Sequence, residues 1–178
     1  PQLRLWGVSQ EGAPTGATLR YRQGQTTAAT WGNAFFLLGG YSHELTVIDG
    51  ATLALQQRIQ LGVELHDLVV DHDRQRLYVN DTASRIYQIN LADLPRKQLR
   101  AERSILAGAG DLTLATPGNL LLAAQTDGDS SQVSVVDVDR WSVTQVITGG
   151  DQVAVDQRRS RALVGSMSSF LPAAAGQI

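Results

Sequence analysis

Apolar residues occur along this chain in short runs that polar, turn-forming segments separate. Many runs come in pairs, with a first apolar segment, a polar turn and a second, more strongly apolar segment, as at 68–70, 71–75 and 77–79. The turns are rich in Asp, Asn, Gly and Pro, which favour tight turns because they bond their own backbone or adopt turn dihedral angles easily. Each pair therefore predicts a β-hairpin, and the arrangement returns at 112–123 and 153–164.

Two more segments follow each hairpin. The third alternates apolar and polar residues with a period of two, as at 45–48 and 133–136, which predicts a strand with one packed face and one more polar face. The fourth, at 55–59 and 144–147, is the most polar, as expected of an outer edge strand. The pattern thus predicts units of four short antiparallel strands, the last of which faces solvent.

These units recur with a period in the forties. A step of apolar residues that ends in an acidic or amide residue, at Asp49, Asn90 and Asp137, repeats at intervals of 41 and 47 residues. A second marker, an Ile followed shortly by Gly, repeats at intervals of 46 and 41 residues. This period is typical of the blade of a β-propeller. We expect an all-β propeller domain over 1–178, with complete blades at 26–62, 63–108 and 109–149.

The two ends of the chain supply half-blades. Residues 150–169 hold only a first and a second strand, whereas 1–25 hold a third and a fourth. Two arrangements remain open: the half-blades pair and close a four-blade ring, or the chain is a fragment of a larger propeller. The chain begins at Pro1 with neither an initiator Met nor a signal-peptide core, so we expect a processed product or an excised piece.

The blade at 63–108 carries a family resemblance. Its segment Leu77-Tyr78-Val79-Asn80-Asp81-Thr82 resembles the bacterial YVTN propeller repeat, named after Tyr-Val-Thr-Asn, although here Asn follows Val with no Thr between them. The resemblance extends over 26–165 as a looser pattern and implies the propeller fold. Members of that family are mostly bacterial or archaeal and often exported, which implies a periplasmic or exported location. They include ligand-binding and surface proteins as well as parts of redox and hydrolytic enzymes.

Composition narrows the classes of function. Fifteen Lys and Arg against seventeen Asp and Glu give a net charge of −2, so the chain has no basic field for nucleic acid. The absence of cysteine excludes disulfides, thiolate metal sites and cysteine nucleophiles. No apolar run approaches the roughly 18 residues of a membrane-spanning helix. With 43% apolar residues the chain is able to bury a core, and we expect a soluble protein.

Candidate chemistry gathers before the first strands of successive blades. Asp67, Asp111 and Asp151 occupy equivalent positions there. Because first strands line the channel of a propeller, these carboxylates are expected to ring one channel mouth and to bind a divalent cation such as Ca²⁺ or a polar ligand. His66 stands beside the ring as a ligand or proton shuttle. The alternative is structural, since an Asp at a strand entrance accepts backbone N–H groups and a structural device recurs in every repeat.

Other charged and aromatic residues are expected to have structural roles. The one basic cluster, at 96–103, contains Glu102 and falls on an outer strand, which predicts a solvated edge that resists strand addition. The three tryptophans are expected to pack between blades; they are Trp6, Trp31 and Trp141.

Two classes of function remain. We expect a non-catalytic binding or scaffolding module that holds a protein partner or a small ligand on the channel face, with no dedicated cofactor. The alternative is a metal-assisted hydrolase of the lactonase kind, or a propeller part of a larger redox enzyme. Propeller hydrolases of that kind surround a metal with Glu, Asn and Asp. Here Glu64, Asn80 and Asp81 all lie in one blade, which argues against a metal encircled by them.

Overall fold

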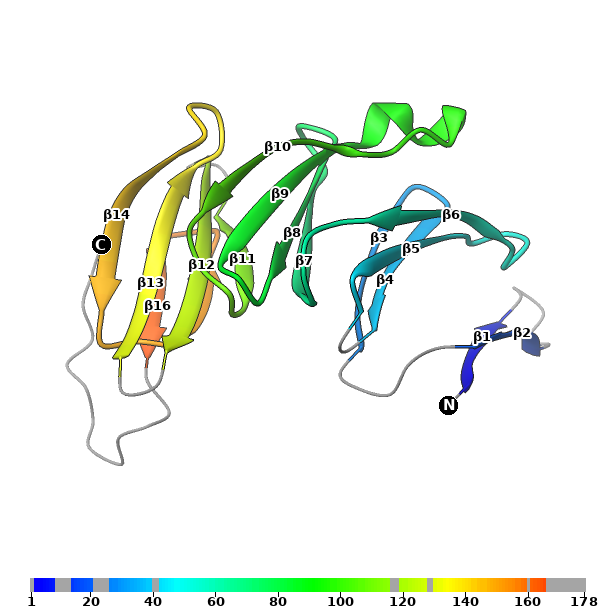
Figure 1. The fold of residues 1–178 in the computed structure, drawn as a ribbon, viewed down its shortest axis with the longest axis horizontal. Coiled ribbons are helices and arrows are strands. Elements are labelled where there is room, and N and C mark those ends of the chain that lie inside the picture. Colours follow the sequence, from blue (N-terminus) through cyan, green and yellow to red (C-terminus); the bar gives the residue numbers. More distant parts are fainter. Residues whose placement is uncertain are drawn as a thin grey trace.

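The computed structural model describes residues 2–8, 14–20, 26–39, 42–115, 119–127, 130–159 and 161–165. Almost all of this part is β-structure, arranged as sheets that stand side by side along an arc (Figure 1). No helix in these ranges is long and apolar enough to cross a bilayer.

Three of the sheets have four antiparallel strands each, in chain order. The first contains β3 (Thr26–Trp31), β4 (Ala34–Gly39), β5 (Glu44–Asp49) and β6 (Leu55–Gln60). The second contains β7 (Leu65–Asp71), β8 (Arg76–Asp81), β9 (Arg85–Asn90) and β10 (Ala101–Leu106). The third contains β11 (Leu112–Ala115), β12 (Leu120–Asp127), β13 (Ser130–Asp137) and β14 (Ser142–Thr148). We call them blades 1, 2 and 3, and they confirm the four-stranded unit expected from the sequence.

The half-blades form two separate hairpins. β1 (Gln2–Val8) pairs with β2 (Pro14–Arg20), and β15 (Gln152–Asp156) pairs with β16 (Arg161–Gly165). They lie at opposite ends of the arc (Figure 1). The two hairpins are separate sheets that do not pair with each other, so the described part of the chain forms an open arc.

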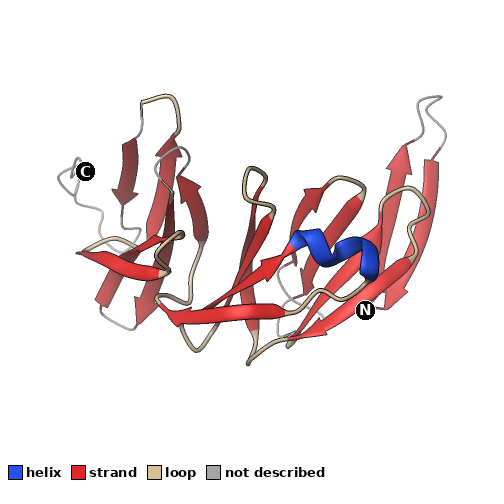
Figure 2. Ribbon diagram, turned by 90° about the horizontal axis from the view of Figure 1, so that it is seen from above, coloured by secondary structure: helices blue, strands red, loops and turns tan. Residues whose placement is uncertain are grey.

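The first strands of neighbouring units lie against one another. β3 contacts β7, β7 contacts β11, and β11 contacts β15. The view from above shows the sheets standing next to one another (Figure 2). The fourth strands are the most exposed, as expected of outer strands; only one residue of β6 is buried and none of β14.

The core lies between the blades. Alternate residues of β8 belong to two different hydrophobic clusters. Leu77 packs with blade 1, whereas Tyr78 packs with blade 3. Third strands are buried on both faces, so the more polar face expected from the sequence is packed as well. Thr46 and Ser134 on this face are only 5% and 4% exposed.

The repeating Asp or Asn at the end of each third strand caps a turn. Asp49 Oδ1 accepts hydrogen bonds from the backbone N–H groups of Ala51 and Thr52, at 3.0 and 2.8 Å. Asp137 Oδ1 does the same for residues 139 and 140, at 3.0 and 2.8 Å. Asn90 caps the 3₁₀-helix η1 (Leu91–Arg96), which the sequence pattern does not predict. The sequence marker of the repeat is thus a turn-forming device.

Candidate functional site

Asp67 lies at an irregularity near the start of β7, where the register with β8 shifts between Leu65 and Leu68. Its carboxylate accepts two backbone hydrogen bonds, one from Leu68 N and one from Leu112 N, each at 2.8 Å. Leu112 begins the first strand of blade 3. The Asp67 side chain therefore ties the inner strand of blade 2 to the inner strand of blade 3.

Asn80, which is fully buried, completes this connection from the neighbouring strand β8. Its Oδ1 accepts a hydrogen bond from Asp67 N at 2.8 Å. Its Nδ2 donates to the backbone carbonyl oxygens of Gly108 and Gly110, at 3.2 and 2.5 Å. We call Asp67 and Asn80, with the backbone at 108–112, the inter-blade latch. It satisfies polar groups that packing would otherwise leave buried and unpaired.

Asp81, the next residue of the YVTN-like segment, is also used inside its own blade. The Asp81 carboxylate accepts hydrogen bonds from the backbone N–H groups of Ala83 and Arg85, both at 3.0 Å, and from the Tyr87 hydroxyl at 2.8 Å. Asn80 and Asp81 thus shape the junction and the turn. Within the described residues, neither side chain belongs to a group of metal ligands.

The predicted channel-mouth residues differ in exposure. His66 and Asp111 are exposed, whereas Asp67 and Asp151 are partly buried. Desolvation by burial raises the pKa of Asp67, and the neighbouring Asp111 charge adds to this, while the two backbone hydrogen bonds oppose it. Asp67 and Asp111 are therefore close enough to repel each other. We call His66, Asp67, Asp111 and Asp151 the strand-entrance surface.

A shared metal ion requires several ligands within reach of one point. In the described part of the chain, no three His, Asp or Glu side chains are placed to hold one ion. Asp67 in addition uses both of its oxygens on backbone amides. The three aspartates recur in the sequence but are not gathered into such a ligand group.

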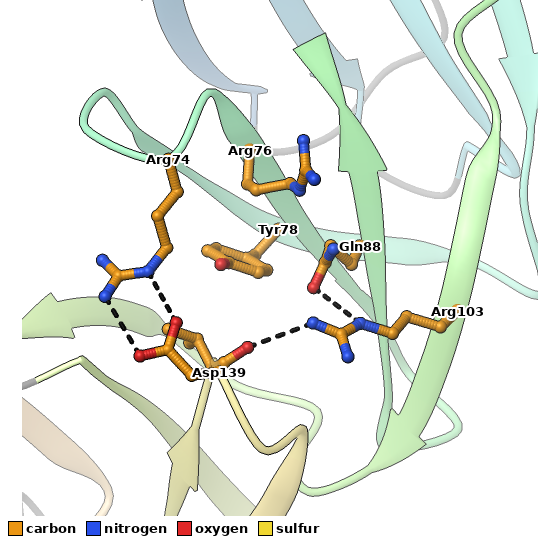
Figure 3. Close-up of a pocket in the computed structure, with 7 residues that line it drawn as sticks. Arg74, Arg76, Tyr78, Gln88, Arg103 and Asp139 are labelled. Atoms are coloured by element: carbon orange, nitrogen blue, oxygen red, sulfur yellow. Dashed lines mark hydrogen bonds and ion pairs between the residues drawn. The ribbon is translucent and has the colours of Figure 1, made fainter. Parts of the chain in front are cut away.

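A second feature lies at the opposite end of the same strands. It is a pocket of about 300 Å³ between blades 2 and 3, which we call the junction pocket (Figure 3). Its lining residues are Arg74, Arg76, Tyr78, Gln88, Arg103, Val138 and Asp139. They come from the turn after β7, from β8, β9 and β10, and from the turn after β13.

Arg74 spans the junction. Its guanidinium donates from Nε to Asp139 Oδ1 at 2.9 Å and from Nη2 to Asp139 Oδ2 at 3.3 Å, which is a two-point contact between blades. Its Nη1 donates to the fully buried Asp71 at 3.3 Å. The hydrogen bond from Arg74 is the main cause that lowers the pKa of Asp139.

Arg103 is held on three sides. Its Nε donates to Gln88 Oε1 at 2.9 Å, and its Nη2 donates to the backbone carbonyl of Val138 at 3.1 Å. The guanidinium carbon lies 4.8 Å from the ring centroid of Trp141. Arg103 is nevertheless exposed, as expected of a solvated edge at 96–103, and its contact with the blade 3 turn is an addition that the sequence pattern does not predict.

Tyr78 forms the floor of the pocket. Its ring stacks on Trp141, with centroids 6.0 Å apart and planes inclined by 23°, in agreement with the expected packing of Trp141 between blades. Burial raises the pKa of Tyr78 to about 12. Its hydroxyl therefore stays protonated near physiological pH. Among the described lining residues, no nucleophile is paired with a general base.

Sequence reasoning missed the junction pocket because its walls come from two blades. Arg74 and Arg76 flank the start of a second strand, and Arg103 lies near the start of the fourth strand of that blade. In an antiparallel blade the starts of the second and fourth strands lie at the same end of the sheet. The sequence could therefore have indicated that these three arginines lie close together. The turn of blade 3 that completes the pocket has no sequence relation to them.

Comparison with known proteins identifies the fold alone. No protein-family model matches the chain, and no curated protein matches it in sequence. Hydrazine synthase from Kuenenia stuttgartiensis is similar in structure, with a TM-score of 0.69 and 16% identity over 92% of this chain and 49% of that one.

Two further structures show the same likeness. The β-propeller domain of Cps50 (Swd1) from Myceliophteria thermophila has a TM-score of 0.65 and 13% identity, over 88% of this chain and 57% of that one. A protein assigned as a 6-phosphogluconolactonase from Bacteroides fragilis has a TM-score of 0.67 and 13% identity, over 93% of this chain and 57% of that one. The chain thus has propeller architecture and spans about half of the length of these structures.

Proposed function

We propose that this chain is a non-catalytic binding module of a β-propeller, which contacts a protein partner or a small ligand through the strand-entrance surface. The observation that supports this proposal is the use of Asp67. Its carboxylate accepts hydrogen bonds from the backbone amides of residues 68 and 112, which supports a structural role for this side chain.

The same frame presents other side chains for contact. His66 lies on β7 and Asp111 directly precedes β11, and both are exposed. The latch fixes these two inner strands to one another. Groups fixed on rigid strands lose little conformational entropy when they bind, which favours specific contacts. Propellers carry many unrelated activities, so this argument rests on the surface and not on the fold.

The test is partner capture by the full chain, in moderate salt, from an extract of the source organism. A double variant, His66→Ala with Asp111→Asn, should lose a partner that the unchanged chain retains in stoichiometric amount. The matched control is His72→Ala with Asp73→Asn, which changes an exposed His and Asp in the turn at the other end of β7. Loss of the partner in both variants, or in neither, contradicts the proposal.

A metal-assisted hydrolase is the competing function. It predicts that Ca²⁺, Mg²⁺, Mn²⁺ or Zn²⁺ raises the melting temperature and that Asp111→Asn abolishes the shift. We expect no shift that depends on Asp111. A saturable, Asp111-dependent shift with any of these ions would favour the hydrolase instead.

A further inference from the structure

The junction pocket has an excess of positive charge among the side chains that line it. Three guanidinium groups face one carboxylate, that of Asp139. Arg74 is the guanidinium that pairs with Asp139, and it also pairs with the buried Asp71 beneath it. The remaining two are Arg76 and Arg103, and the nearest other carboxylate is Glu102, with Oε2 at 3.9 Å from Arg76 Nε.

These two arginines retain donors after their internal contacts. Within the described residues, the hydrogen bonds of Arg76 start from Nη1, to Asn90 Oδ1 and to the backbone carbonyl of Gln75, at 2.5 and 3.4 Å. Those of Arg103 start from Nε and Nη2. Nη2 of Arg76 and Nη1 of Arg103 are thus left to meet a ligand or solvent.

The same contacts hold the arginines in place. Gln88, only 4% exposed, orients Arg103 from below, and the Trp141 ring covers one face of the guanidinium. Asn90 orients Arg76 in the same way. Binding to such side chains costs less entropy than binding to freely rotating surface arginines.

Tyr78 closes the base of the pocket. The residue is fully buried and its ring stacks on Trp141, so its hydroxyl is not presented to a ligand. The donors that face a ligand are therefore those of the two arginines.

We propose that the junction pocket binds a carboxylate group through Arg76 and Arg103. The planar guanidinium matches the two oxygens of a carboxylate, and a charge-assisted pair of this kind is among the stronger hydrogen bonds in proteins. Glu102 offsets part of the charge of Arg76, which favours a singly charged group over a phosphate dianion. A volume of about 300 Å³ takes a small organic acid or one acidic side chain of a partner protein. The site is at the other end of the strands from the strand-entrance surface and does not depend on its function.

The experiment measures thermal unfolding and calorimetric binding of the full chain at constant ionic strength. The probes are succinate, inorganic phosphate and an acetylated hexaglutamate peptide, with sodium chloride as the balancing salt. We expect saturable binding of succinate or of the peptide, and the better of the two identifies a small acid or a protein as the source of the carboxylate. Binding of phosphate alone, or of neither carboxylate probe, overturns the proposal.

Variants locate the site. Arg103→Gln and Arg76→Gln should each weaken binding at least tenfold, whereas Arg140→Gln should leave it unchanged. Arg140 makes the matched control because it lies at the same end of blade 3, is 80% exposed at its side chain and is outside the pocket lining. Equal affinity in the pocket variants and the control overturns the proposal.

Two gentler variants keep the test decisive if an arginine variant does not fold. Arg103→Lys retains the charge but not the planar guanidinium, so it should weaken binding about threefold to tenfold. Arg76→Lys retains the charge but not the planar pair of donors, and should also weaken binding. Unchanged affinity in both of these folded variants contradicts the assigned contacts.

Discussion

The inter-blade latch makes a quantitative prediction about Asp67. Asp67→Ala removes the acceptor of two backbone N–H groups, those of residues 68 and 112. A buried donor that loses its partner costs about 1–3 kcal/mol. Part of this cost is offset because the variant has no carboxylate to remove from water on folding. In the unchanged protein this desolvation is the effect that raises the pKa of Asp67. We expect a net loss of about 2–3 kcal/mol in the free energy of unfolding.

The assay is thermal unfolding followed by circular dichroism. For a chain of this length, each kcal/mol lowers the melting temperature by about 2–4 °C, so Asp67→Ala should lower it by about 4–12 °C. The control is Asp111→Ala, the equivalent position of the next blade. Because the Asp111 side chain is exposed, its removal should change the free energy of unfolding by less than about 0.5 kcal/mol.

The pH dependence of this difference has a definite sign. The folded state binds the Asp67 proton more tightly than the unfolded state, because the folded pKa is raised above 3.8. The unchanged protein therefore loses stability relative to Asp67→Ala as the pH rises from the unfolded pKa through the folded one. The destabilisation caused by Asp67→Ala should accordingly be larger at the acid end of this window than at neutral pH. Equal melting temperatures for the Asp67 and Asp111 variants, or the opposite pH trend, would refute the latch.

Three other predictions follow from the described contacts. Asn80→Ala should lower the free energy of unfolding in urea by about 2–4 kcal/mol. Asn80→Asp should lower it more at neutral pH, because a carboxylate would face two carbonyl oxygens, and the reverse order would contradict this role of Asn80. Gly62→Ala should lower the melting temperature, since its Cβ would meet the Tyr87 hydroxyl. Gly165→Ala should not, because its Cβ would meet nothing within 4 Å, and equal shifts would count against the packing around Gly62. Ultraviolet titration should show Tyr78 and Tyr87 ionising near pH 12, and the free energy of unfolding should fall as the pH rises through about 10 to 12. Ionisation of all four tyrosines near pH 10 would exclude this.

Much of the blade architecture was predictable from local patterns. The Asp or Asn at 49, 90 and 137 marks the repeat because a turn at each of these points needs a side-chain oxygen to accept backbone N–H groups. The polar fourth strands mark the outer edge because solvent meets them. Such signals are readable because the residue and the group that it serves are a few positions apart.

The candidate sites were predictable only in part. The position of Asp67 at a strand entrance was visible, but its partner, Leu112 N, belongs to another blade. The buried polar face of the third strand in blade 3 and the contact between Arg103 and Val138 depend on the neighbouring unit in the same way.

The amino-acid sequence by itself determined the strands, the turns and the period of the repeat, because hydrogen bonding and burial alternate over a few residues within one hairpin. The tertiary structure alone decided which carboxylate serves the frame, which arginines line a pocket and how far the arc closes. Those properties depend on the angle and spacing at which one blade packs on the next. That packing brings together residues 35–65 positions apart, such as Arg74 and Asp139, for which the chain carries no local signal.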